Sequence, residues 1–184
     1  ISYGNVNGYG ADTNGGDINS ATEAVYKQYA NILLAPTEVT GGFFISRNKS
    51  TTAVPSNAAV SSGKDTEIYV LSARRSLMKD RLNKKNWTIV LTGSLQNGVD
   101  GAPKLSLTDD SSDDSPTATP VGDRYNIVSG AAGTISGSGA ADRTYGFFYP
   151  DMGLMVFSGT ELSASIPGSG SQKNSAANFG PVTD

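Results

Sequence analysis

The chain contains no histidine and no cysteine among its 184 residues. Without an imidazole or a thiol it cannot form a Ser-His-Asp or a Cys-His nucleophile. The same absence excludes zinc and iron sites that depend on those ligands, and it excludes disulfide bonds, which agrees with assembly in a reducing cytoplasm. Carboxylate, lysine and tyrosine chemistry remains, but no catalytic arrangement of these groups is recognisable. We therefore expect neither an enzyme nor a bound cofactor or metal.

Charge and long apolar runs are also scarce. Charged residues make up 17% of the chain and the net charge is −3, so nothing attracts the whole chain to nucleic acid or to an anionic membrane. The longest apolar runs, Ile32–Pro36 and Gly153–Phe157, are too short to span a bilayer. We expect no membrane partner and no direct nucleic-acid partner.

The chain is rich in small and turn-forming residues, with 22 glycines among them. This composition is typical of β structure with many turns. Two ends have too little apolar content to fold alone, and we interpret residues 1–17 and 167–184 as extended Gly/Ser-rich arms. The first arm either orders on a neighbouring subunit or connects to an upstream domain, since the chain begins at Ile1 instead of Met. Residues 18–166 form the predicted β-rich domain.

One helix is predicted, over about residues 20–34. Ser20 and Glu23 have the spacing of a capping box, and Pro36 ends the pattern. An apolar stripe at helical spacing predicts the face that packs on the core or on another subunit; it consists of Ala21, Val25, Tyr29, Ile32 and Leu33.

Alternating and apolar segments predict the strands, and the turn Pro150–Gly153 predicts a hairpin between the two strands beside it. Ser76–Leu82 is expected to make two helical turns whose leucines point inward, and Gly130–Gly139 is expected to be a loop. The predicted strands are Glu38–Ile45, Glu67–Ser72, Asn86–Thr92, Leu105–Thr108, Tyr125–Val128, Thr144–Tyr149, Leu154–Phe157 and Leu162–Ile166.

Two charged clusters are candidate sites. Four carboxylates between Asp109 and Asp114 offer the oxygen ligands that calcium prefers, but the EF-hand pattern is absent, so a solvated turn is the favoured interpretation. Six of the 14 basic residues lie between Arg74 and Lys85, where only Asp80 opposes them. Such a cluster predicts a contact with an acidic partner, or else the solvated face of a short helix.

Several segments resemble virion structural proteins of large contractile-tailed phages of the marine cyanophage type, and they occur in the same order as in that family. They are Ala24–Leu34, Ile68–Leu82, Asn86–Ser94, Leu107–Ser111, Arg124–Gly130 and Tyr145–Phe157. The likeness covers about residues 20–166 and departs from the family where Asn83–Asn86 replaces an expected glycine turn. It implies a virion component whose partners are other virion proteins and copies of itself.

Together these observations predict a mainly β fold, an antiparallel sandwich or partly open barrel with one packed helix. The expected function is that of a structural subunit of a phage virion, in the tail or baseplate, assembled in the host cytoplasm. The alternatives are a carbohydrate- or host-surface-binding module with Tyr3, Tyr9, Phe147 and Tyr149 as stacking aromatics, a capsid-associated decoration protein, and a less favoured polysaccharide-degrading tail-spike enzyme. The residues expected at subunit contacts are Arg74, Arg75, Lys79, Arg81, Tyr26, Tyr29, Phe147 and Tyr149.

Overall fold

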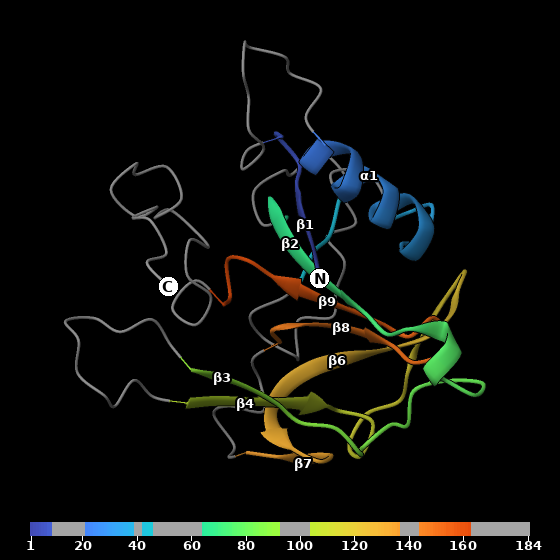
Figure 1. The fold of residues 1–184 in the computed structure, drawn as a ribbon, viewed down its shortest axis with the longest axis vertical. Helices are drawn as coiled ribbons and strands as arrows, with labels where there is room; N and C mark the ends of the chain where they lie inside the picture. The colour runs from blue at the N-terminus through green and yellow to red at the C-terminus, as the bar shows by residue number, and fades with distance from the viewer. Residues whose placement is uncertain (9–20, 39–41, 46–63, 93–103, 137–143, 163–184) are drawn as a thin grey trace, which may run out of the picture.

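The computed structural model describes residues 1–8, 21–38, 42–45, 64–92, 104–136 and 144–162 (Figure 1). Within these ranges the chain is mainly β, with a single α-helix. The elements are β1 (Ser2–Asn5), α1 (Ala21–Leu33), β2 (Glu67–Ser72), the 3-10 helix η1 (Arg75–Leu77), β3 (Ile89–Thr92), β4 (Lys104–Asp109), β5 (Thr117–Thr119), β6 (Gly122–Ala131), β7 (Thr134–Ile135), β8 (Gly146–Tyr149) and β9 (Leu154–Ser158).

The strands form one antiparallel sheet that curls into a half-barrel, as the sequence predicts. Its order is β1-β2-β9-β8-β6-β4-β3, and the short strands β5 and β7 both pair with β6. Figure 1 shows α1 lying over the end of the sheet that contains β1 and β2. The first strand, β1, and the last strand, β9, both pair with β2, which lies between them in the sheet.

The first residues belong to this sheet and not to an arm. Ser2 to Asn5 pair with Val70 to Glu67 of β2, so the prediction of an extended N-terminal arm is wrong for these four residues. Gly4 faces the helix so closely that a Cβ atom there would lie 2.9 Å from the backbone nitrogen of Tyr26. A glycine at this position allows α1 to rest directly on β1. Residues 9–17 and 167–184, the rest of the predicted arms, lie outside the described residues.

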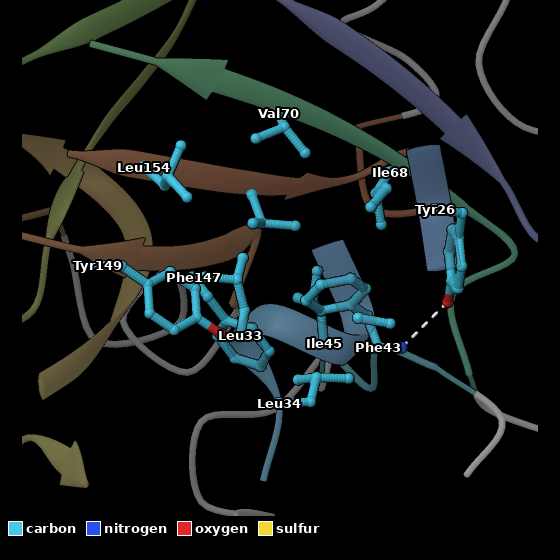
Figure 2. Close-up of a cluster of buried hydrophobic side chains, with 12 residues drawn as sticks. Tyr26, Leu33, Leu34, Phe43, Ile45, Ile68, Val70, Phe147, Tyr149 and Leu154 are labelled. Atoms are coloured by element: carbon cyan, nitrogen blue, oxygen red, sulfur yellow. Dashed lines mark hydrogen bonds between the residues drawn. The ribbon is translucent and has the colours of Figure 1, made fainter. Parts of the chain in front are cut away.

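Both faces of the central strands are covered by apolar side chains. On one face α1 and residues 42–45 pack on β2, β8 and β9, as Figure 2 shows. On the other face the apolar side chains of β4, β6, β8 and β9 pack together with Leu82 and Trp87, which precede β3. All five residues of β9 are buried, because its side chains alternate between the two cores.

The helix is confirmed, but its buried face is not the predicted one. The buried residues of α1 are Tyr26, Ala30 and Leu33, whereas Ile32 is 41% exposed. Tyr29 is only partly buried, at the margin of the same core. The predicted stripe and the observed stripe have the same spacing and are displaced by one residue, with Leu33 common to both. Ser20 of the predicted capping box lies outside the described residues.

Most predicted strands are confirmed, including the hairpin of β8 and β9 around Pro150–Gly153. The strand before β4 begins only at Ile89, and residues 42–45 form no strand. The expected loop after Gly130 is wrong in its first part, because β6 continues to Ala131 and turns back into β7. Leu162 lies at the end of a turn, and the rest of the strand expected there is outside the described residues.

The register of the helix yields a direct test. Leu33 is fully buried, so Leu33→Ala should lower the free energy of unfolding by about 2–5 kcal/mol through lost burial and a residual cavity. The neighbouring Ile32→Ala serves as a matched control and should cost less than about 1 kcal/mol, because its side chain is half-exposed. Chemical denaturation of both variants measures the difference. Equal losses, or a larger loss for Ile32→Ala, would contradict this register.

Candidate subunit-contact surface

The connection between β2 and β3 carries four of the predicted contact residues. We call residues 74–81 the basic loop. It leaves the sheet after β2, makes the single turn of η1 and returns toward β3. The expected two-turn helix does not form, and Leu77 is 82% exposed instead of pointing inward. Only Leu82, just after the loop, reaches the core.

Main-chain hydrogen bonds hold both ends of the basic loop to the β8–β9 turn. The N–H of Ala73 donates to the carbonyl oxygen of Gly153 at 2.9 Å, and the N–H of Leu82 donates to that of Pro150 at 3.0 Å. The guanidinium of Arg75 donates to the carbonyl oxygens of Asp80 (3.2 Å) and Asp151 (3.3 Å). The loop is thus fixed at its base and within its span.

Gly153 makes room for the loop. Its φ is +68°, which favours glycine, and a Cβ atom there would lie 2.4 Å from the sulfur of Met78. The side chain of Met78 therefore packs directly on the backbone of the turn. The turn sequence that the chain needs for the β8–β9 hairpin is also the sequence that seats the basic loop.

The basic residues of this region divide into two groups. Arg74, Lys79 and Arg81 are exposed on the loop. Arg75 is exposed too, but its guanidinium helps to hold the loop. Lys84, in contrast, donates to the hydroxyl of Tyr125 at 2.9 Å and lies 4.9 Å from the centre of that ring. The predicted basic patch is therefore mainly a surface feature, with Lys84 as the member that packs on the protein itself.

The predicted aromatic contacts belong to the chain's own core. Tyr26 and Tyr149 are each 1% exposed and Phe147 is 6% exposed; Figure 2 shows all three inside the helix-side cluster. The prediction of a surface role for these three residues is wrong, because they cover the face of the sheet on which α1 packs. The same burial removes Phe147 and Tyr149 as sugar-stacking aromatics. Tyr29, partly buried, and Tyr3, partly buried against Tyr69 with ring centres 5.2 Å apart, keep some exposed surface.

Hydrogen bonds that the sequence did not predict connect the segments of the core beneath α1. The hydroxyl of Tyr26 accepts from the N–H of Phe43 at 3.0 Å and donates to the carbonyl oxygen of Asp65. The carboxylate of Asp65 accepts from the N–H of Ile45 at 2.8 Å and from the hydroxyl of Ser158. Burial raises the pKa of Tyr26 to about 12 and that of Asp65 to about 6. These groups hold segments of chain and do not face solvent.

An ion pair closes the same core near β6. The guanidinium of Arg124 lies 3.2 Å from the carboxylate of Glu38, and both side chains are largely buried. Arg124 also lies over the ring of Phe147, 4.3 Å from its centre. No local sequence pattern signals this pair, because its members are separated by 86 positions and meet only through the packing of the loop after α1 on the sheet.

The acidic patch is divided between core and surface. Asp109 accepts the N–H of Lys85, and Asp110 accepts both the N–H and the side-chain amide of Asn126 at 3.0 and 2.8 Å. Asp113 and Asp114 are exposed in the turn that follows. Within the described ranges no group of three or more acidic residues is arranged to hold a metal ion. Sequence spacing alone could not separate these structural carboxylates from their exposed neighbours.

No protein-family model, no curated protein and no solved structure matches this chain. Among the described helices, none has the length and apolar character needed to cross a membrane.

The seating of the basic loop can be tested at Gly153. A Gly153→Ala substitution forces a side chain into the space of Met78 at a strained φ, and we expect a loss of about 1–3 kcal/mol in unfolding free energy. The double variant Gly153→Ala/Met78→Ala should recover part of this loss beyond the sum of the single effects, which denaturation of the four proteins of the cycle measures. Strictly additive effects would show that the two residues do not touch.

The buried carboxylate predicts a pH dependence of stability. Because the pKa of Asp65 is raised by burial from 3.8 to about 6, the folded state binds more protons than the unfolded state between these values. The contribution of Asp65 is therefore most favourable below pH 4 and falls by up to about 3 kcal/mol as the pH rises through 6.

Asp65→Asn isolates this effect. An asparagine can keep the bond from the N–H of Ile45 through its oxygen and can donate to Ser158 through its amide. The unfolding free energy of Asp65→Asn minus that of the wild type should therefore increase from pH 4 to pH 7. Thr66→Ala, at the exposed neighbouring residue, changes no titratable group and should give a constant difference. A constant difference for Asp65→Asn as well would disprove the raised pKa.

Proposed function

We propose that this chain is a structural subunit of a bacteriophage virion, in its tail or baseplate. It acts by contacts with neighbouring virion proteins and performs no chemistry on a substrate. Its place of assembly is the host cytoplasm, and its final location is the particle.

The observation that carries this proposal is the basic loop. Four basic residues lie within four positions of Leu77 in the sequence. Leu77 itself is 82% exposed, and both ends of the loop are anchored to the β8–β9 turn. Arginine is enriched at protein interfaces, and an exposed leucine beside it offers apolar surface that a partner can bury. The sequence segments that resemble phage virion proteins include this loop and the hairpin that seats it, which supports a contact inside a virion.

The described titratable groups support a structural role as well. The groups whose pKa values are displaced most, Tyr26, Asp65 and Tyr149, are buried, and burial is the main cause of each shift. Displaced pKa values mark catalytic groups when they lie in a cleft open to substrate. Here Tyr26 and Asp65 connect helix, loop and strand.

Incorporation into particles tests the proposal. Arg74→Glu, Lys79→Glu and Arg81→Glu together should exclude the protein from particles while leaving its melting temperature within a few degrees of wild type, because surface substitutions cost little. Arg75 is left unchanged because it holds the loop. Gln28→Glu with Asn31→Glu on the exposed side of α1 is the control and should be incorporated normally.

Quantitative mass spectrometry of purified particles, separated into heads and tails, gives the readout. Recovery of the wild-type protein with tails supports the tail or baseplate position, and recovery with heads favours the decoration-protein alternative. Absence from both fractions would overturn the proposed function. Normal incorporation of the loop variant would show that the virion contact lies elsewhere on the chain.

A further inference from the structure

The charge of this chain is strongly separated along its sequence. Residues 74–85 contain six cations and one acid, a net charge of +5, of which the basic loop (residues 74–81) carries +3. Since the whole chain carries −3, the remaining residues carry −8. A partner with an acidic surface would be attracted to the basic loop, and this chain itself supplies such a surface.

An exposed acidic segment lies on the same part of the molecule. We call residues 110–114 the acidic turn; Asp113 and Asp114 are its exposed members. The N–H of Lys85, just beyond the basic loop, donates to Asp109 at 2.9 Å, immediately before the acidic turn. In Figure 1 the chain after η1 runs toward the end of β4, where this turn begins. Lys85, which ends the cationic segment 74–85, therefore lies beside the end of β4 from which the acidic turn starts.

The apolar side chains of this region are also exposed. Leu77 is 82% exposed, and Met152, on the turn that seats the basic loop, is 41% exposed. Isolated exposed leucines are common, but this one lies among cations on a loop held by main-chain hydrogen bonds. Burial of Leu77 against a partner would add an apolar centre to a charged interface.

We propose that this surface binds a second copy of the chain about a two-fold axis, with the basic loop of each copy on the acidic turn of the other. In such an interface the same contact occurs twice, once from each copy. A surface that carries both a basic and an acidic segment can therefore be complementary to itself. Leu77 of each copy is buried near the axis. The proposal rests on the proposed function, because it names the partner of the basic loop.

Nucleic acid and anionic membranes are the competing partners for a basic loop. Both carry anionic groups alone and offer no cations to the acidic turn, whereas a second copy presents both signs of charge in the same contact. The test therefore includes duplex DNA and phosphatidylserine vesicles as probes beside the protein itself.

Sedimentation equilibrium of the purified full chain measures the association. We expect a monomer–dimer equilibrium in about 20 mM NaCl that weakens at least about tenfold in about 500 mM NaCl, because surface charges are screened. The acidic-loop variant (Arg74→Glu, Lys79→Glu, Arg81→Glu) and the basic-turn variant (Asp113→Lys, Asp114→Lys) should each be monomeric. Gln28→Glu with Asn31→Glu should dimerise like the wild type.

Mixing the two variants is the decisive experiment. In a one-to-one mixture the acidic loop of one variant meets the basic turn of the other, and the basic loop of the second meets the acidic turn of the first. The first of these contacts has reversed polarity and the second is the wild-type contact, so both attract and a heterodimer should form although neither variant dimerises alone. Leu77→Ser should weaken the wild-type dimer at least about tenfold, because it removes the apolar side chain that the interface buries.

Several outcomes would overturn the inference. The first is a wild type that stays monomeric at low salt. The second is a dimer whose affinity changes neither with salt nor in the acidic-loop variant. The third is a mixture of the two variants that stays monomeric. Binding of the wild-type loop to DNA or vesicles without dimerisation would assign it to that partner instead. The two proposals fail separately: a dimer that is absent from particles refutes the virion role alone, and an incorporated protein that never dimerises refutes the two-fold contact alone.

Discussion

The buried hydroxyl of Tyr26 is the contact on which the arrangement of helix and sheet depends. A hydroxyl withdrawn from water costs free energy unless it is paired, and this one is paired in both directions, to the backbone of Phe43 and of Asp65. Asp65 in turn binds the N–H of Ile45 and the hydroxyl of Ser158 on β9. One continuous set of hydrogen bonds thus runs from α1 through the segments before β2 to the centre of the sheet. The backbone of the same Tyr26 lies against Gly4 of β1, where a Cβ atom would come within 2.9 Å of it.

The double burial of the sheet determines which surfaces remain for partners. β9 is buried over its whole length, with one set of side chains under α1 and the other in the opposite core. The opposite core is closed by the sheet's own curl and by side chains from the β2–β3 connection, among them Leu82 and Trp87. A central strand of this kind has no free face, so partners of the described part contact other surfaces, such as the exposed side of α1, edges, turns and connections. The basic loop belongs to the last of these.

The sequence predicts the elements better than it predicts their environments. Alternation identifies β2, β4, β6 and the β8–β9 hairpin because a strand's period is read directly from neighbouring residues. The helix is equally clear, but Val25, Tyr29 and Ile32 have the same spacing as Tyr26, Ala30 and Leu33. The second stripe is buried because it packs on the core formed with the sheet, which local sequence does not reveal. The same limit applies to the site. Exposure of Arg74, Lys79 and Arg81 follows from their charge, whereas the burial of Phe147 and Tyr149 depends on a helix far away in the sequence.

The hydrogen bonds that hold the basic loop lower the conformational free-energy cost of binding a partner there. A loop that orders only on contact spends much of its interaction energy on lost conformational freedom. Here Ala73, Arg75 and Leu82 fix the loop to the β8–β9 turn through hydrogen bonds to main-chain oxygens. Of these three residues only Arg75 is charged, so most of the loop's charge stays exposed. The cost that remains is the ordering of long arginine and lysine side chains, which is offset when each finds a carboxylate and when an apolar side chain such as Leu77 leaves water at the same time. A rigid base with charged, mobile tips therefore suits a contact that is made many times in an assembly, because the fold has ordered the backbone before the partner arrives.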